Sequence, residues 1–244
     1  MSQPPVAQPP VILLTRPAGQ SDRFAQALRE RFPSVDIVIS PLIAPSFPPI
    51  TLPDRRCSAI IFTSETAVQA AKRIVADGAD LPELAFCVGD QTARAARATG
   101  FQAQSAQGDA SDLIALIQAA TVVGPMLYLH GRDTRGDLPK HLESRGIETH
   151  SCLAYAQNEQ PLTVAATAVL CAKRPVIAPV FSARSGQILA RECARIAAKA
   201  PLHVVAISPA AGAVFSQTTV SYAARPDTLA MLAAIAQQLD APPP

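Results

Sequence analysis

Short apolar runs alternate with amphipathic stretches along most of the chain. The runs hold mainly Val, Ile, Leu and Phe, as strands buried on both faces do, and they cover residues 11–14, 59–62, 85–88, 126–129, 176–181 and 204–207. Between them apolar residues recur at helical spacing, for example Phe24, Ala27 and Leu28 within residues 21–31. This alternation predicts an α/β fold, with parallel strands covered by helices on both faces.

Two extended segments, residues 35–41 and 148–157, interrupt the alternation, and a proline-rich stretch follows the first. We expect both to cross between domains, since 244 residues suit two domains of roughly 100–120 residues each. The proline-rich ends, residues 1–10 and 241–244, are expected to be disordered tails. The opening residues resemble no signal peptide and no apolar run reaches the length of a membrane span, so a cytoplasmic protein without a membrane partner is expected.

The sequence also contains an internal repeat. Three pairs of residues lie 119 positions apart (181 − 62, 207 − 88, 232 − 113), namely Phe62 with Phe181, Val88 with Ile207, and Leu113 with Leu232. A weaker match, 114 positions apart, relates Phe24 and Leu28 to Leu138 and Leu142. The chain therefore resembles two diverged copies of one α/β unit. Two similar domains that face each other leave a cleft, which is a common place for a ligand.

Composition and missing motifs exclude several classes of protein. The net charge is only +2, Trp is absent and Lys and Arg are not clustered, so nucleic acid is not an expected partner. The five cysteines form no CxxC and the four histidines show no metal spacing, which argues against a zinc site or a disulfide framework. The motifs GxGxxG, GxxxxGK[ST] and GxSxG are absent, so neither a nucleotide site nor a hydrolase elbow is indicated.

The turns from strand to helix instead carry hydroxyls, glycines and arginines. These turns are Thr15-Arg16, Thr63-Ser64, Gly89 to Thr92, Gly131-Arg132, Ser182 to Arg184, and Ser208. Ligands of open α/β sheets gather at the carboxyl ends of strands, and helix N-termini there bind anions. Any single serine among them could be a simple helix N-cap. Several such turns on two facing domains favour a cleft for a ligand with many carboxylates or phosphates.

The same turns resemble the motifs of the uroporphyrinogen-III synthase family. The similar segments are Thr15-Arg-Pro17, Ile60-Ile-Phe-Thr-Ser64, Val88-Gly-Asp-Gln-Thr-Ala93 with Gly100, the series Gly131, Arg135, Leu138, Leu142, Gly146 and Tyr155, then Val180-Phe-Ser182 and Ala206-Ile-Ser208. Each motif is short, but their order and spacing extend the resemblance from Val11 to Leu239.

The resemblance implies a fold of two doubly wound parallel-sheet α/β domains joined by a two-stranded antiparallel linker, with a cleft between them. Carried over to this sequence, residues 11–38 plus 158–240 form a discontinuous domain 1 and residues 42–152 form domain 2. The two extended segments would be the linker. The repeat alone would indicate two contiguous domains, so the resemblance changes that expectation.

The resemblance also implies a reaction of porphyrin and haem biosynthesis. A lyase of this family takes hydroxymethylbilane, removes its hydroxyl as water, inverts the D ring through a spiro intermediate and closes the macrocycle to uroporphyrinogen III. No metal or organic cofactor is implied. The substrate carries eight carboxylates, which suits the anion-binding cleft. The implied partners are this small molecule and, transiently, the preceding enzyme of the pathway, and the implied state is a monomer.

Tyr155 matches the tyrosine thought to assist departure of the hydroxyl. The implied substrate-binding residues are Arg16, Thr63, Ser64, Gly89, Thr92, Gly131, Arg135, Ser182, Arg184 and Ser208, with the three arginines as carboxylate clamps. One departure is that Ala206-Ile-Ser-Pro-Ala-Ala211 lacks the threonine that the family often has there. The residues alone also fit an inactive paralogue, or a two-lobed protein that binds an anionic ligand.

Overall fold

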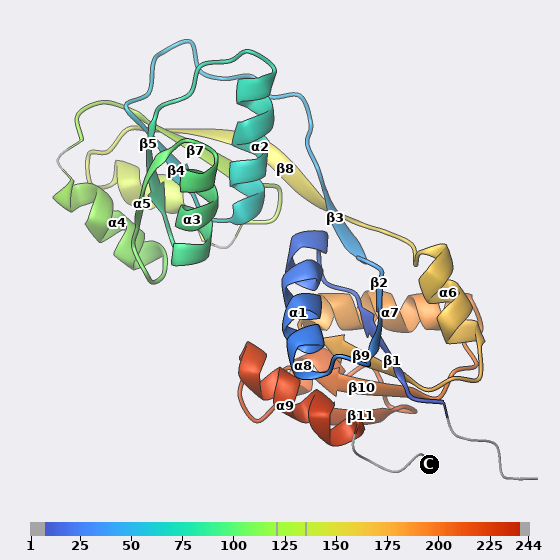
Figure 1. Ribbon diagram of the computed structural model, residues 1–244. Coiled ribbons are helices and arrows are strands. Elements are labelled where there is room, and N and C mark those ends of the chain that lie inside the picture. Colours follow the sequence, from blue (N-terminus) through green and yellow to red (C-terminus); the bar gives the residue numbers. More distant parts are fainter. Residues whose placement is uncertain (1–7, 121, 135, 240–244) are drawn as a thin grey trace, which may run out of the picture. The chain divides into compact units, whose positions relative to one another are not determined.

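The computed structural model describes residues 8–120, 122–134 and 136–239. The chain divides into two compact units, unit 1 with Met1–Ala44 and Glu159–Pro244, and unit 2 with Pro45–Asn158. Unit 1 is therefore built from the two ends of the chain, and unit 2 from its middle. Each unit is an α/β sandwich of helices around one sheet (Figure 1).

The described part of unit 1 contains a five-stranded parallel sheet in the order β11-β10-β9-β1-β2. Its strands are β1 (Val11–Leu14), β2 (Asp36–Ile39), β9 (Val176–Val180), β10 (Leu202–Ala206) and β11 (Thr219–Tyr222). Its helices are α1 (Ala18–Arg31), α6 (Val164–Cys171), α7 (Ala183–Arg195), α8 (Pro209–Gly212) and α9 (Thr228–Leu239).

The described part of unit 2 contains a six-stranded sheet in the order β3-β8-β7-β4-β5-β6. Its strands are β4 (Ala59–Phe62), β5 (Leu84–Cys87), β6 (Gln102–Ser105) and β7 (Met126–Gly131), together with β3 (Ile43–Ser46) and β8 (Thr149–Glu159). The chain passes between the units within these last two strands, because residues 43–44 of β3 and Glu159 of β8 belong to unit 1. Its helices are α2 (Glu65–Ala76), α3 (Asp90–Ala98), α4 (Ala110–Ala119) and α5 (Leu138–Glu143). The strands from β8 to β6 pair in parallel.

The two units share one strand order. Read from the edge, β11-β10-β9-β1-β2 of unit 1 corresponds to β6-β5-β4-β7-β8 of unit 2. The chain order reverses between β9 and β1 in one unit and between β4 and β7 in the other. Helix α1, after β1, corresponds to α5, after β7, as the weaker match of Phe24 and Leu28 to Leu138 and Leu142 predicts. Such reversals are topological switch points, where open α/β sheets bind their ligands.

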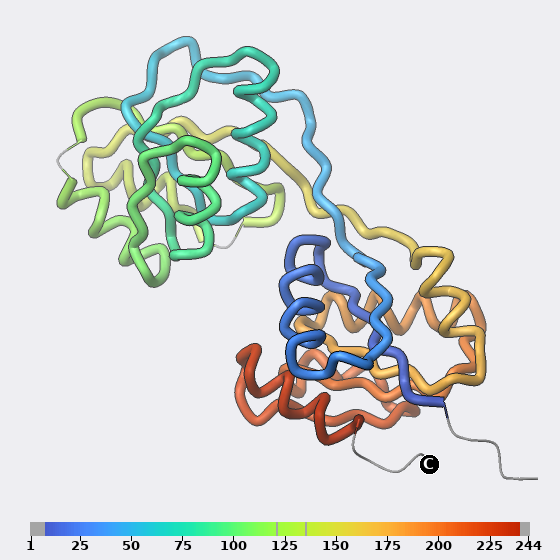
Figure 2. The backbone as a smooth tube through the Cα atoms, in the orientation of Figure 1, coloured from blue at the N-terminus to red at the C-terminus, as the bar shows by residue number. Residues whose placement is uncertain are grey.

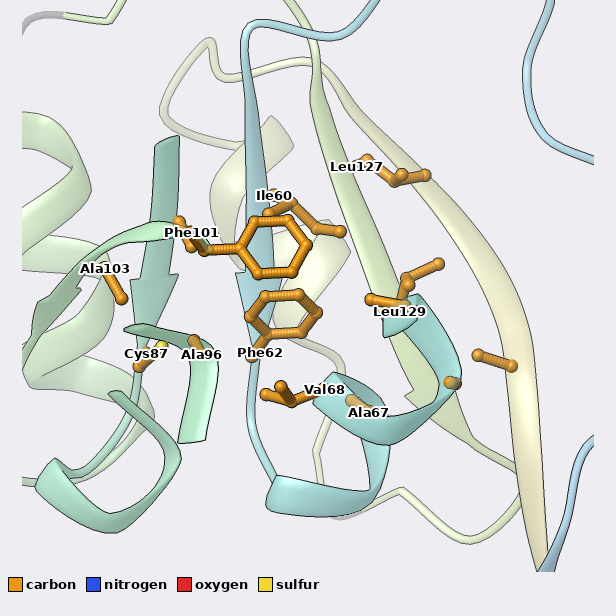
Figure 3. Packing of buried hydrophobic residues seen from close by; sticks show 14 of the residues in the cluster. Ile60, Phe62, Ala67, Val68, Cys87, Ala96, Phe101, Ala103, Leu127 and Leu129 are labelled. Atoms are coloured by element: carbon orange, nitrogen blue, oxygen red, sulfur yellow. The ribbon is translucent and has the colours of Figure 1, made fainter. Parts of the chain in front are cut away.

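Each sheet is covered on both faces, as the doubly wound prediction requires. Along β4, Ile60 and Phe62 join the cluster under α2 and α3, while Ala59 and Ile61 join the cluster under α4 and α5. Figure 3 shows the first cluster, where the ring of Phe62 meets that of Phe101 edge to face, with ring centroids 5.2 Å apart. In unit 1, α6, α7 and α8 cover one face and α1 and α9 the other.

The first of the two expected crossing segments, residues 35–41, does not cross between the units but lies within unit 1. Residues 36–39 form β2, which pairs in parallel with β1 inside unit 1, because Ile37 and Ile39 pack on one core cluster of that unit and Val38 on the other. The strand that lies beside β8 is β3 instead, within the proline-rich stretch (Figure 2). Its edge position tolerates Pro45, which has no N–H to donate.

The pairing of β3 with β8 is antiparallel. The N–H of Gln160 donates to the carbonyl of Leu42 at 2.9 Å, and the Nδ2 of Asn158 donates to the Oγ of Ser46 at 2.9 Å. The residue numbers of the two strands therefore run in opposite directions.

Among the described helices none is long and apolar enough to cross a bilayer.

Candidate functional site

The turn between β4 and α2 carries the first predicted hydroxyls. Ser64 is the N-cap of α2, and its Oγ accepts a hydrogen bond from the N–H of Ala67 at 3.1 Å. The same Oγ lies 2.9 Å from the hydroxyl of Tyr155 on β8. The structure thus joins the predicted catalytic tyrosine to a predicted site serine 91 positions away in the sequence.

The position of Tyr155 depends on β7, the strand between β4 and β8. The register of β7 with β8 shifts between His130 and Gly131, so that Gly131 lies opposite Tyr155, and the N–H of Arg132 donates to the Tyr155 carbonyl at 2.9 Å. A Cβ on Gly131 would lie 2.6 Å from Cε2 and Cζ of the Tyr155 ring and 2.9 Å from its hydroxyl. The glycine is therefore needed for close approach: the ring occupies the space that any side chain there would take.

The neighbouring hydroxyl, Thr63, meets a second tyrosine. Its Oγ1 lies 3.4 Å from the hydroxyl of Tyr128, a buried residue of β7. Burial raises the pKa of Tyr128, and the hydrogen bond with Thr63 offsets only part of that rise. Tyr128 was not predicted as a site residue. Its apolar run, Met126-Leu-Tyr-Leu129, reads as a core strand, and only the register with β4 brings its phenol to the turn.

The β5–α3 turn lies beside this one, because the N–H of Val88 donates to the carbonyl of Phe62 at 3.2 Å. Gly89 is the N-cap of α3 in an extended conformation, and a Cβ there would meet nothing within 4 Å. Thr92, in the first turn of α3, is buried with 7 % of its surface exposed. Gly89 therefore borders open space, whereas the Thr92 side chain packs into the unit.

The corresponding turns of unit 1 carry Ser182 and Ser208. Ser182 is the N-cap of α7, and its Oγ accepts from the N–H of Ser185 at 3.1 Å. Ser208 caps the four-residue helix α8 through a longer bond of 3.4 Å from the N–H of Ala211. The N–H of Ile207 donates to the Val180 carbonyl at 2.9 Å, which sets the two turns side by side.

These caps correct the alignment of the repeat at one point. Ser182 and Ser64 cap equivalent helices and lie 118 positions apart (182 − 64), so Phe181 occupies the place of Thr63 and not that of Phe62. The reason is that the unit 1 core strand β9 ends at Val180, which pairs with Ala206 as Phe62 pairs with Cys87. Phe181 is therefore a turn residue and not part of a core strand.

Of the three predicted arginines, Arg16 is the one that the structure fixes at a switch point. Its guanidinium carbon lies 3.9 Å from the centroid of the Phe181 ring, and its Nε donates to the Oε1 of Gln20 at 3.1 Å. Burial, and to a lesser degree the charge of Arg23, lower its pKa. Arg184 is an exposed residue in the first turn of α7, and Arg135 lies outside the described residues.

The structure thus gathers Thr63, Ser64, Gly131 and Tyr155 at the switch point of unit 2. At the switch point of unit 1 it places Arg16 beside Phe181, next to the Ser182 cap. Within the residues that the structure describes, no group of three or more His, Cys, Asp or Glu is arranged to hold a metal ion. These arrangements offer a phenol hydrogen-bonded to a serine, and a cation beside a helix N-terminus.

Comparison with solved structures finds chains that are similar to this one. The crystal structure of uroporphyrinogen-III synthetase from Helicobacter pylori 26695 has the same fold, with a TM-score of 0.61 and 17 % identity, over 94 % of this chain and 99 % of that chain. A mutant uroporphyrinogen III synthase from the extremely thermophilic bacterium Thermus thermophilus matches with a TM-score of 0.47 and 13 % identity, over 94 % of this chain and 98 % of that chain.

No curated protein matches the sequence. The family model described as uroporphyrinogen-III synthase HemD matches residues 22–233, which is most of the chain and includes the switch-point turns of unit 2 and those of unit 1 at Ser182 and Ser208. The chain therefore belongs to the uroporphyrinogen-III synthase family.

Proposed function

We propose that this chain is a lyase that converts hydroxymethylbilane into uroporphyrinogen III in porphyrin and haem biosynthesis. The hydroxyl of the substrate leaves as water, the D ring is inverted and the ring closes. The reaction loses one water and changes no oxidation state, so its chemistry requires no redox cofactor. The membership of the chain in the uroporphyrinogen-III synthase family supports this proposal.

The observation that carries the mechanism is the hydrogen bond of 2.9 Å between Ser64 and Tyr155. The Oγ of Ser64 already accepts the N–H of Ala67, so its own proton is available to the Tyr155 oxygen. We take Ser64 as the donor of this pair, which leaves the phenolic proton of Tyr155 for a substrate oxygen. In the proposal, Tyr155 donates this proton as the C–O bond breaks, and the bonding electron pair leaves with the oxygen as water.

In this proposal the carboxylates of the substrate bind at the strand-to-helix turns. Arg16 offers a guanidinium, and the N-terminal N–H groups of α2, α3 and α7 offer donors in the turns that carry Ser64, Gly89 and Ser182. Holding a flexible chain of four pyrroles in one folded conformation would supply much of the rate enhancement and would prevent closure without inversion. The proposed enzyme acts as a cytoplasmic monomer, with transient contact to the preceding pathway enzyme.

The test is a coupled assay in which hydroxymethylbilane is generated in place and the type III and type I isomers are separated. The wild-type chain should yield the type III isomer. Formation of the type I isomer alone, as without enzyme, would refute the proposed function and leave an anion-binding protein or an inactive paralogue.

Tyr155→Phe tests the assigned proton donor in the same assay. We expect kcat to fall by about 10²–10⁴-fold, which is the usual contribution of a general acid. The urea unfolding midpoint should stay close to that of the wild type, since only one hydroxyl is removed. An unchanged kcat would reduce Tyr155 to a packing residue over Gly131.

A further inference from the structure

The environment of Arg16 constrains its guanidinium on several sides. One face lies on the Phe181 ring, at 3.9 Å from carbon to centroid, and the Nε edge is occupied by its bond of 3.1 Å to Gln20. The backbone is held as well, because the buried Ser21 donates its hydroxyl to the Arg16 carbonyl at 2.8 Å. Neither Phe181 nor Gln20 was among the predicted site residues.

The register of the sheet explains the stacking. Ile12 of β1 pairs with Ile177 of β9, and four residues further on Arg16 comes opposite Phe181 (16 − 12 = 181 − 177). The Phe181 ring is itself held by Phe24 of α1, edge to face, with centroids 5.0 Å apart and planes at 81°. The ring therefore packs against Phe24 of α1 as well as against the Arg16 guanidinium.

An arginine has five N–H donors in a planar fork, and among the residues that the structure describes only the Nε donor has a partner. Within the described parts of the chain, no acceptor is found for the two terminal nitrogens of Arg16 and no carboxylate forms an ion pair with it. The two terminal nitrogens of this half-buried guanidinium are therefore available to a carboxylate, which can accept two parallel N–H···O bonds from them.

We propose that Phe181 and Gln20 are positioning residues, which hold Arg16 so that its two terminal nitrogens bind one substrate carboxylate end-on. This inference rests on the proposed function and makes it more specific. Phe181 sets the plane of the guanidinium, and Gln20 blocks the side-on approach through Nε. Neither residue needs to touch the reacting atoms.

Two substitutions test the proposal through KM in the isomer-resolved assay. Phe181→Leu removes the ring and should raise KM by roughly fivefold, the loss expected for one partly desolvated cation–π contact. Gln20→Glu places a carboxylate on the guanidinium itself, so it should compete with the substrate and raise KM by about tenfold. In both variants kcat should stay within about twofold of the wild type, because the interaction removed concerns binding and not the chemical step.

The controls separate positioning from folding and from net charge. Phe32→Leu removes a ring that packs on the same cluster at the C-cap of α1 and leaves Phe24 and Phe181 unchanged, and Gln26→Glu adds the same charge to an exposed position of the same helix. Both controls should leave KM near the wild-type value. In an Arg16→Met background, Phe181→Leu should raise KM no further, because the group that it positions is gone.

An unchanged KM in Phe181→Leu and Gln20→Glu would overturn the inference, as would a full effect of Phe181→Leu in the Arg16→Met background. Either result can be obtained while the enzyme still forms the type III isomer. Failure of the positioning role is therefore distinguishable from failure of the proposed function, in which the wild type forms no type III isomer.

Discussion

Gly131→Ala should disable the enzyme through Tyr155 without removing any functional group. The new Cβ would lie 2.6 Å from the Tyr155 ring, and an ordinary contact begins at 3.4 Å, so the ring must move by 0.8 Å (3.4 − 2.6). Directed away from Ser64, that shift lengthens the Ser64–Tyr155 bond from 2.9 to 3.7 Å (2.9 + 0.8), beyond hydrogen-bond range; in other directions it misaligns the phenol with the substrate. A misplacement of about 1 Å can cost roughly a hundredfold in rate, so we expect kcat to fall by roughly 10–100-fold.

The assay is the same isomer-resolved measurement, combined with urea unfolding. Overpacking should reduce the free energy of unfolding by about 1–3 kcal/mol, and the variant should remain folded at low urea. The matched comparison is Gly131→Ala in a Tyr155→Phe background. There the phenolic proton is already absent, so the alanine should reduce kcat little further. A wild-type kcat in Gly131→Ala, or fully multiplicative effects in the double variant, would refute the reasoning.

Three further predictions concern stability and thiol chemistry. Ser182→Ala should lower the free energy of unfolding by about 1 kcal/mol in urea titrations, because α7 loses its N-cap bond from Ser185. Hydrogen bonds from Arg195 lower the pKa of Glu192 from 4.5 to about 2, so its contribution to stability is complete above pH 4.5 and disappears as the pH falls to about 2. In Glu192→Gln the urea midpoint should therefore decline less over that range than in the wild type. Cys171 is exposed, while burial raises the pKa of Cys87 to about 11, so a thiol reagent at neutral pH should label Cys171 rapidly and Cys171→Ser should remove that fast phase.

The sequence predicted the buried part of the fold well and its edges poorly. The runs at β4 and β9 are apolar because both faces of these central strands are covered, and burial leaves a clear pattern in the sequence. The edge strands β6 and β11 were not predicted. Their sequences, Gln102-Ala-Gln-Ser105 and Thr219-Val-Ser-Tyr222, are mostly polar because one side of each faces solvent.

The site was predictable as a set of turns and not as a set of contacts. Ser64 and Ser182 follow directly from the pattern of a strand, a serine and a helix. The bond from Ser64 to Tyr155 depends on the register shift at His130 and Gly131, which places Tyr155 opposite Gly131. Since no local pattern encodes a register shift between strands, only the family resemblance could select Tyr155.

The two switch points use one topology for different chemistry. In unit 2, Phe62 pairs with Leu129, so Thr63 comes opposite His130, and both lie near the phenol of Tyr128. In unit 1 the equivalent positions hold Phe181 and Arg16. A hydroxyl in one turn supports neutral hydrogen bonding, whereas a ring in the other supports a cation.

At each switch point the residue at one position therefore limits which residue its neighbour can be: Phe181 supports Arg16, and Gly131 leaves room for Tyr155. A leucine at 181 would leave the guanidinium without a surface on which to stack, and a side chain at 131 would displace the phenol. The proposed reaction needs both kinds of site, because the substrate must have its carboxylates neutralised and its hydroxyl protonated. A duplicated unit whose copies diverged at these few turn positions would meet both needs, while the sheet order of each copy stays the same.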